Sequence, residues 1–260
     1  MKRMNDQVGD HLKVNSLNRV DHQPAYVLMS QPWKESSLLV EVLTRNYGRL
    51  SLIARSARRP KSALRGVLMP FAPLQIAWFG KNELRTLHGA EWCYGIAQLT
   101  NIFLWSGFYI NELVLRLTGR EDPMPELFDI YDKTMRSLAS QCELSTTLRH
   151  FELSLLQLFG YSLTLDQDVN GKCIAPENYY LCEPKTLPQI VTHYSSNDLV
   201  SDGAVLLAIS KRDFSSDKAC RFAKRLTKKW IESLLPNGKL LVREILNGVG
   251  MMNDECGKLF

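Results

Sequence analysis

Near Gln98 the spacing of apolar residues changes from every second residue to every third or fourth. Before this point the apolar residues form short alternating runs, which is the pattern of half-buried strands. After it they recur at helical spacing over segments longer than ten residues. A run of strands followed by a run of helices predicts an α+β protein with a β-structured N-terminal part and a mostly helical remainder.

Five short strands are predicted ahead of this change, separated by turn residues and by one long loop. They cover residues 26–32, 38–44, 49–55, an apolar run over 67–79, and 83–92. Pro70 and Pro73 favour an edge or a bend in the fourth, because proline cannot donate to a strand ladder. Five short strands with a long loop after the third predict a small, closed or partly closed barrel, and the OB-fold is the leading member of that class. Residues 1–23 are polar, and we expect them to form a loose extension.

The helical part divides at prolines, glycines and capping residues. Helices are predicted over 100–117, 126–139, 145–159, 201–210 and 216–234, with a short one over 240–246. The first should bury Phe103, Leu104, Phe108, Leu113 and Leu117, and the third should begin at a Ser145 or Thr146 cap. Residues 166–196 are loop-rich, with a short strand near 179–181. The predicted domains are a flexible extension (1–24), a barrel (25–97), a helical domain (98–165), a small loop subdomain (166–200) and C-terminal helices that complete the helical domain (201–260).

One segment, residues 42–82, has eight Lys or Arg residues and no acidic residue. The whole chain has a net charge of +5, so the rest of the chain sums to −3. A strand that leads into a purely basic loop is a common way to hold a nucleic-acid backbone, whereas a solvated surface is the alternative interpretation. The predicted phosphate contacts are Arg45, Arg49, Arg55, Arg58, Arg59, Lys61, Arg65 and Lys81.

Aromatic residues within and near this basic segment could stack on bases. Tyr47, in a polar turn, and Trp33, beside Lys34, are the candidates. Phe71 and Trp78 lie in apolar runs, and we expect them in the core instead.

The predicted helix over 216–234 is also basic. Phe222, Leu226 and Trp230 lie near one side, and the cations lie over the rest. A basic amphipathic helix can bind a membrane surface, a partner protein or nucleic acid, and it can also be merely a solvated outer face. Beside the basic segment, nucleic acid is the simplest hypothesis. Its predicted contacts are Arg221, Lys224, Arg225 and Lys228.

No catalytic constellation is found, and no enzyme, cofactor or metal is predicted. The chain has no G-x-x-x-x-G-K-[ST], G-x-G-x-x-G, G-x-S-x-G or H-E-x-x-H motif. Cys173, Cys182 and His193 could supply three zinc ligands, but structural zinc needs four, usually with a C-x-x-C pair. The six cysteines lack any such pair, which indicates reduced thiols in a cytoplasm. Residues 1–24 have no apolar signal region, and no apolar run is long enough to span a membrane.

Several stretches together resemble the bacterial RecO family of recombination mediators. They run in order over about residues 25–246 and are AYVL (25–28), PWKESSL (32–38), GRL (48–50), ARSAR (54–58), LRG (64–66), PFAPL (70–74), YINEL (109–113), LRHFEL (148–153), LFGY (158–161) and RE (243–244). The resemblance implies an OB-fold, a helical domain and a zinc-finger-like insertion. Because only Cys173 and Cys182 stand in that insertion, it is expected to be degenerate and without zinc.

The resemblance also implies partners and a location. Members of the family bind single- and double-stranded DNA and anneal complementary strands. They bind the acidic C-terminal tail of single-strand binding protein and work with RecR to help load RecA. A cytoplasmic, nucleoid-associated protein is therefore expected.

The tail of single-strand binding protein needs an apolar pocket with a cation at its mouth. In the predicted helix over 145–159, Leu148, Phe151 and Leu155 form one stripe, and Arg149 lies beside it in the first turn. We predict that Arg149 binds the tail carboxylate. The alternatives are a solvated arginine and one paired with Glu152 three residues later.

Two other functional classes stay open at this point. One is an RNA-binding OB-fold module of the translation machinery, and the other is a metalloenzyme that uses the region of Cys173 to His193.

Overall fold

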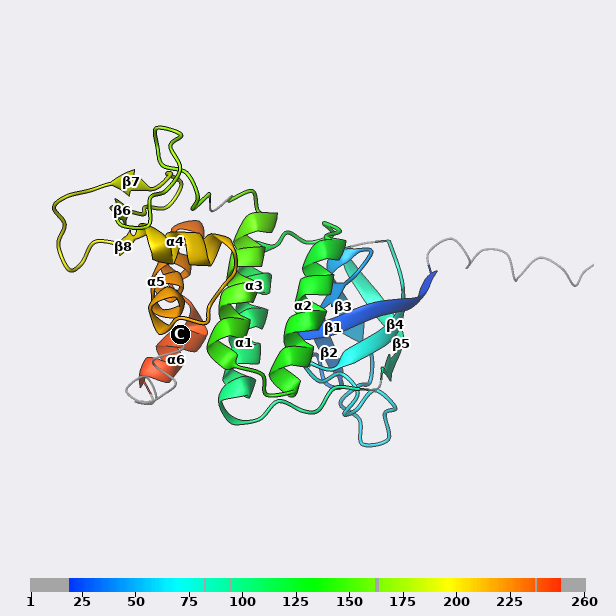
Figure 1. Ribbon diagram of the computed structural model, residues 1–260. Helices are drawn as coiled ribbons and strands as arrows, with labels where there is room; N and C mark the ends of the chain where they lie inside the picture. Colours follow the sequence, from blue (N-terminus) through cyan, green and yellow to red (C-terminus); the bar gives the residue numbers. More distant parts are fainter. Residues whose placement is uncertain (1–18, 82, 94, 162–163, 237, 249–260) are drawn as a thin grey trace, which may run out of the picture. The chain divides into compact units, whose positions relative to one another are not determined.

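The computed structural model describes residues 19–81, 83–93, 95–161, 164–236 and 238–248. The expected extension therefore lies mostly outside the described residues, as does Asn82. The chain forms two compact units (Figure 1). One comprises residues 1–95 with 119–125, and the other comprises 96–118 with 126–260.

The first unit is a closed five-stranded barrel in the order β1-β2-β3-β5-β4. Its strands are β1 (Arg19–Trp33), β2 (Ser37–Thr44), β3 (Gly48–Ala54), β4 (Pro73–Phe79) and β5 (Leu84–Trp92). The predicted α+β class and the OB-like barrel are confirmed. Two boundaries differ from the prediction by more than one residue. Residues 19–24, expected in the extension, form the start of β1, and the fourth strand begins only at Pro73 because residues 67–72 turn.

Closure of the barrel depends on the length of β1. Its N-terminal half pairs with β4, from Arg19↔Phe79 to Tyr26↔Pro73, and its C-terminal half pairs with β2, ending at Trp33↔Ser37. The register with β2 shifts after Val27, just beyond Tyr26, the last residue of β1 that pairs with β4. The parallel pairing of β3 with β5 completes the ring. A bulge and a long shared strand are the usual means of closing a small barrel.

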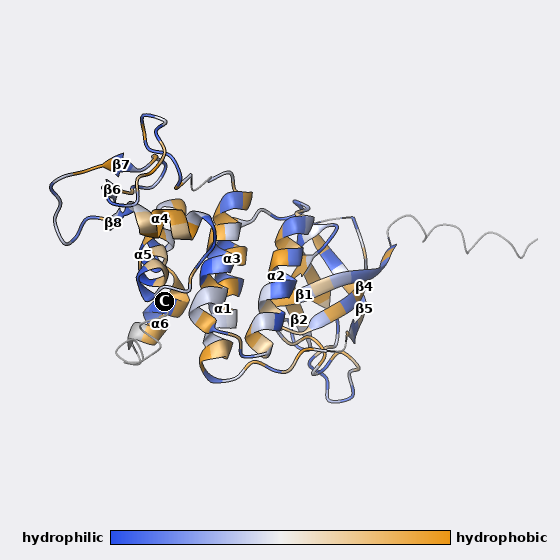
Figure 2. Cartoon of the chain, viewed as in Figure 1, coloured by the Kyte–Doolittle hydropathy of each residue, from blue (hydrophilic) through white to orange (hydrophobic). Residues whose placement is uncertain are grey.

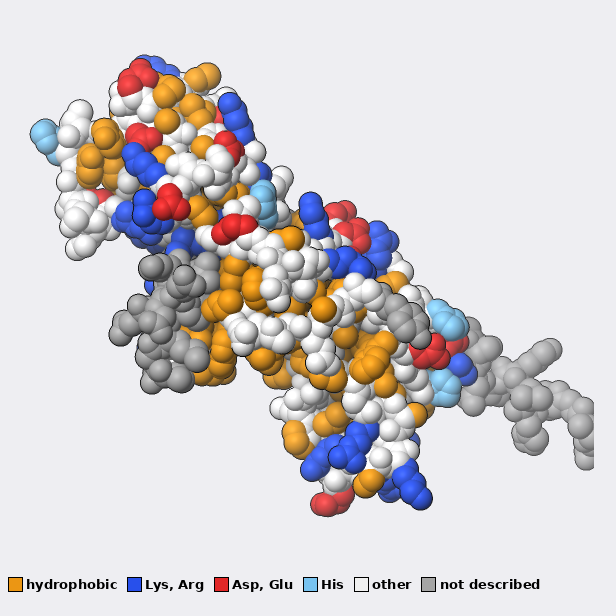
Figure 3. Space-filling view, turned by 60° about the horizontal axis from the view of Figure 1, so that its bottom comes forward, with side chains coloured by type: hydrophobic (Ala, Val, Ile, Leu, Met, Phe, Trp, Pro, Cys, Tyr) orange, Lys and Arg blue, Asp and Glu red, His pale blue; other side chains and the backbone are white. Residues whose placement is uncertain are grey.

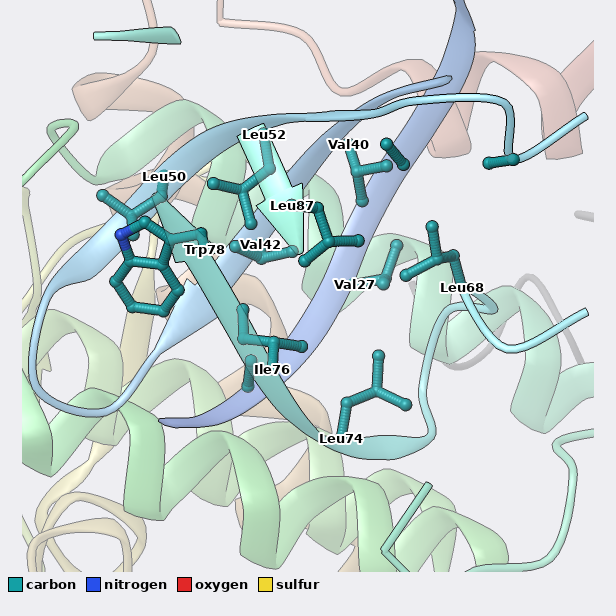
Figure 4. Packing of buried hydrophobic residues seen from close by; sticks show 13 residues of the cluster. Val27, Val40, Val42, Leu50, Leu52, Leu68, Leu74, Ile76, Trp78 and Leu87 are labelled. Atoms are coloured by element: carbon teal, nitrogen blue, oxygen red, sulfur yellow. The ribbon is translucent and has the colours of Figure 1, made fainter. Parts of the chain in front are cut away.

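The barrel interior is filled by aliphatic residues around one tryptophan (Figure 4). Alternate residues of each strand point inward, as the period of two predicts. Val40 and Val42 from β2 meet Leu50 and Leu52 from β3. Trp78 is only 1% exposed and Phe71 is buried, which confirms their predicted places in the core.

Gly48 ends the tight turn between β2 and β3 with a φ of +67°. A Cβ atom built there would lie 2.1 Å from the backbone oxygen of Asp122, which belongs to the same unit. Both the left-handed backbone and this close approach require glycine at the position.

The second unit is mainly helical, with α1 (Asn101–Leu117), α2 (Pro125–Ala139), α3 (Leu144–Leu158), α4 (Gly203–Ser210), α5 (Asp217–Leu234) and α6 (Leu241–Gly248). Hydrophilic and hydrophobic residues intermix along α2 and α3, as expected for helices that bury one side (Figure 2). Gly160 has a φ of +76° directly after α3, as predicted for a helix end.

The buried face of α1 differs from the predicted one. Phe108 is exposed, whereas Tyr109, Ile110 and Val114 are buried beside Leu113. Apolar residues surround most of this helix, so periodicity alone could not select the inward side. The inward side includes Asn111, whose side-chain oxygen accepts a 2.6 Å hydrogen bond from the Tyr131 hydroxyl.

The start of α3 also differs from the prediction. Glu143, rather than Ser145 or Thr146, is the N-cap, and its carboxylate accepts hydrogen bonds from the backbone N–H groups of both of those residues. Arg149 is therefore the sixth residue of the helix and does not lie in its first turn.

Residues 166–200 of the second unit include most of a small sheet with the order β7-β6-β8. Its strands are β6 (Tyr179–Leu181), β7 (Gln189–Ile190) and β8 (Val200–Asp202). The predicted strand near 179–181 is confirmed. Asp202 then caps α4 by accepting a 3.0 Å hydrogen bond from the backbone of Val205. Within the described part of the chain, no helix is both long enough and apolar enough to cross a membrane.

Candidate nucleic-acid interface

The loop that follows β3 presents a row of exposed cations. We call residues 55–66 the basic loop, and its cations are Arg55, Arg58, Arg59, Lys61 and Arg65. None of the five forms an ion pair with any acidic residue that the structure describes. In Figure 3, Lys and Arg side chains gather at one end of the barrel unit, with hydrophobic side chains and an acidic side chain among them. A surface on which cations predominate attracts a polyanion.

Successive turns give the basic loop its form. The backbone N–H groups of Arg59, Ser62 and Arg65 each donate to the carbonyl three residues earlier, at 3.0–3.1 Å. Ala57 is buried and anchors the start of the loop in the barrel core. The cations consequently project from an internally hydrogen-bonded scaffold.

Arg58 joins the basic loop to the turn between β1 and β2. Its guanidinium donates to the backbone carbonyl oxygens of Lys34 and Glu35 at 3.4 and 3.3 Å. Its backbone N–H donates to the backbone carbonyl oxygen of Ser36. This contact places exposed Lys34 at the same end of the barrel. We call this the loop end, formed by residues 33–37, the basic loop and the end of β5.

The other predicted contacts of the basic segment lie at the opposite end. Arg45 and Tyr47 stand in the turn between β2 and β3, and Lys81 follows β4. The ring of Tyr47 packs edge-on against Trp78, near the end of β4, at 5.1 Å between centroids. The predicted contact residues, which are neighbours in one sequence segment, therefore lie in two groups at opposite ends of the barrel.

Arg49 is engaged with a buried carboxylate. Its guanidinium donates to Glu41 at 3.3 Å, and the same carboxylate also accepts from Arg120 at 2.9 Å and from the Ser51 hydroxyl. Burial lowers the pKa of Arg49 from its ordinary value. Because its charge compensates Glu41, Arg49 has a structural role that the sequence did not indicate. Its phosphate contact stays a prediction, which this geometry does not favour.

The cations of α5 are more closely paired than those of the basic loop. Arg221 lies 3.6 Å from Asp217, and Lys228 lies 4.0 Å from Glu232. Arg225 donates to the backbone oxygen of Asp198 at 2.8 Å. Burial, followed by the nearby Arg149 charge, lowers the pKa of Lys224 to about 8. The positive potential of this face is correspondingly reduced.

The predicted tail-binding residues are all buried in the helical unit. Leu148, Phe151 and Leu155 are at most 1% exposed. Arg149 is also 1% exposed and donates to Glu152 at 2.9 Å, which is the pairing stated above as an alternative. A peptide carboxylate could reach this guanidinium only if the helical unit opened.

Glu152 is the centre of a buried polar network. Its carboxylate accepts from the Tyr109 hydroxyl at 2.7 Å, from Arg149 and from the Thr227 hydroxyl. Arg243 in turn donates to the Tyr109 oxygen at 3.2 Å. Burial is the main cause that raises the pKa of Tyr109, which stays protonated and donates. Sequence reasoning found only one contact of this network, because its members lie far apart along the chain.

The small sheet does not offer the donors that a zinc site needs. Cys182 is buried, and burial raises the pKa of its thiol to about 12, which opposes the thiolate form that binds metal. Cys173 and His193 are exposed. Within the described ranges, no three potential metal ligands converge. The donor set therefore does not fit a structural zinc ion.

Comparison with known proteins gives matches over most of the chain. The family model described as "Recombination protein O N terminal" matches residues 19–96, and "Recombination protein O C terminal" matches residues 104–240. The chain is 45% identical over 240 residues to "DNA repair protein RecO" of Chromobacterium violaceum, covering 91% of this chain and 98% of that protein. Proteins of the same name from Dechloromonas aromatica (41% over 235 residues, 89% and 97%) and Neisseria meningitidis serogroup B (40% over 238 residues, 89% of each chain) are also similar.

Proposed function

Because this chain belongs to the RecO family of DNA repair and recombination proteins, we propose that it binds single- and double-stranded DNA and anneals complementary strands. The observation that carries this proposal is the basic loop, with five exposed cations and no described acidic partner. Sites that hold DNA by its backbone obtain most of their affinity from such contacts, without regard to sequence.

Annealing needs no covalent chemistry. Two complementary strands repel each other through their phosphates, and a basic surface that contacts both lowers this barrier. The proposed role is thus that of a mediator that brings strands together, and the basic loop provides the charge for it.

The proposed partners follow from the family. They are RecR, RecA indirectly, and the acidic tail of single-strand binding protein. The location of the tail site remains a prediction. Arg149 in its present position is bonded to Glu152, so binding there would require this pair to separate.

The salt dependence of DNA affinity tests the role of the basic loop. Neutralising Arg59 and Lys61 together with glutamine should weaken binding to all sequences alike. It should also flatten the slope of log K against log salt by about 1.4–1.8, since each lost phosphate contact contributes about 0.7–0.9. The matched control changes Arg116 and Arg136 to glutamine, because both are exposed but paired with acidic residues one helical turn away.

The control has the same change in net charge as the loop variant. A difference between the two variants therefore reports the position of the lost cations and not the overall charge of the protein. An unchanged slope in the loop variant, or an equal change in both variants, would exclude the loop as the phosphate site. Annealing of complementary oligonucleotides, followed by fluorescence without nucleotide or metal, should be slower in the loop variant than in the control. A parallel titration with RNA of the same sequence tests the translation-module alternative, which requires a preference for RNA.

A further inference from the structure

Trp92 is an exposed tryptophan at the end of a barrel strand. It is 52% exposed, the largest value among the aromatic residues that the structure describes. It is the last residue of β5, where it pairs with Leu74 of β4. Burial of a tryptophan is strongly favourable, so one left half open at a strand end needs a reason.

A hydrogen bond fixes the orientation of this ring. The indole N–H of Trp92 donates to the carbonyl oxygen of Val67 at 2.9 Å. One ring edge is therefore held against the chain that leaves the basic loop, while much of the ring surface is open to solvent. A ring fixed in this way loses little side-chain entropy when a flat group stacks on it.

The same hydrogen bond places the ring beside the cations. Val67 is two residues after Arg65, and Gly66 stands between them with a φ of +84°. A Cβ atom built on Gly66 would meet nothing within 4 Å, so the space beside the loop is open. An open aromatic face next to uncompensated cations matches a nucleotide, which has a flat base and an anionic phosphate.

We propose that Trp92 is a base-stacking platform for single-stranded DNA, working with the basic loop. This inference rests on the proposed function and adds to it a means of discrimination between unpaired and paired strands. In a duplex the base faces are covered by their neighbours, so only the phosphates are available. In a single strand an unstacked base can lie on the indole while its phosphate is held by the loop.

Affinities of two substitutions for two DNA forms test this platform. Trp92→Ala should weaken binding of a single-stranded thymidine oligonucleotide about tenfold. It should change the affinity for a blunt duplex less than about twofold and leave both salt slopes unchanged, because no phosphate contact is lost. Trp92→Phe keeps a ring without the N–H group and should recover most of the single-strand affinity.

Phe79→Ala is the matched control, because Phe79 is 42% exposed at the opposite end of the same barrel. It should bind both DNA forms as the wild type does. An equal loss in this control, an equal loss of single-strand and duplex binding by Trp92→Ala, or no loss at all would overturn the platform. Absence of DNA binding by the wild-type protein would overturn the proposed function itself, which the same titrations reveal separately.

A measurement on the unaltered chain covers the case in which Trp92→Ala does not fold. A single-stranded oligonucleotide containing 5-iodouracil, irradiated in complex with the wild-type protein, should cross-link to the peptide that contains Trp92. Cross-links confined to other aromatic residues would overturn the assignment.

Discussion

The arginines of the basic loop and two arginines of the helical unit, Arg149 and Arg243, lie in opposite environments. Arg55, Arg59 and Arg65 are exposed and have no ion-pair partner among the residues described. Arg149 and Arg243 are buried and bonded to Glu152, Tyr109 and Glu232. The first group creates a positive electrostatic potential outside the protein, whereas the second group neutralises carboxylate charge inside it.

This difference indicates that a cationic side chain is available to bind a ligand only when it is not paired with a carboxylate inside the protein. Arg49 and Arg149 illustrate the point, because both were predicted to bind a ligand and both are bonded to a buried glutamate.

The largest effect is expected at the centre of the buried network. Glu152→Leu leaves the guanidinium of Arg149 buried without its carboxylate, and it should destabilise the helical unit by about 3–5 kcal/mol. Replacing both residues with leucine should recover part of this loss, because no buried charge then remains unpaired. Urea unfolding followed by circular dichroism measures both.

The matched control is Asp132→Leu, whose partner Arg136 is exposed on the surface of α2. Loss of that pair should cost about 0.2–1 kcal/mol. If Glu152→Leu cost no more than this control, the network would be energetically equivalent to a surface pair and the comparison would fail.

A smaller effect is expected inside the barrel. Arg49→Met removes one of the donors to Glu41 and should destabilise the barrel unit by roughly 1–3 kcal/mol. It should not alter the salt slope of DNA binding, because Arg49 is not among the exposed loop cations. Arg120→Met, which removes the other and more exposed guanidinium, should cost less. A flatter salt slope in Arg49→Met would return this residue to the DNA site.

The fold was largely predictable because its signals are local. Alternating apolar residues, turn glycines and the change of period near Gln98 gave the barrel and the helices. The prediction of the inward face of α1 was wrong. Tyr109 and Asn111 lie on that face, where they form hydrogen bonds with Glu152 and Tyr131, which are 43 and 20 positions away in the sequence. Periodicity contains no information about such distant partners.

The candidate site was predictable only in part, for the same reason. A run of cations without acids marks the basic loop, but the burial of Glu41 and its position beside Arg49 depend on strand register. Trp92 was missed because its exposure and its bond to Val67 arise only when β5 and the basic loop meet. Segment 42–82 looked like one surface, whereas the strand directions divide it between two ends of the barrel.

The next largest expected effect is a difference between the basic loop and α5 in the salt dependence of DNA binding. Arg221→Gln together with Arg225→Gln should flatten the salt slope by less than about 1, compared with about 1.4–1.8 for the loop pair. The reason is that Arg221 already has Asp217 as a partner and Arg225 is bonded to a backbone oxygen. Equal slopes would show that internal pairing does not decide which cations bind DNA.

The smallest effect concerns Lys224, whose pKa is lowered to about 8 mainly by burial and then by the Arg149 charge. Between about pH 8 and the ordinary lysine value of 10.5, the unfolded chain binds more protons at this site than the folded chain. Stability of the helical unit should therefore contain a component that rises with pH across this window. Lys224→Met should remove that component and stabilise the unit slightly at pH 7, because a half-buried charge is no longer desolvated.

The same titration separates the two cationic regions in DNA binding. The pKa of Lys224 is lowered to about 8, so this side chain loses its charge above that pH. DNA affinity of the wild type should thus stay nearly constant between pH 7 and 9 if the loop dominates. A fall in affinity over that range that disappears in Lys224→Met would show instead that α5 makes the main contact, and it would reverse the order of the two regions.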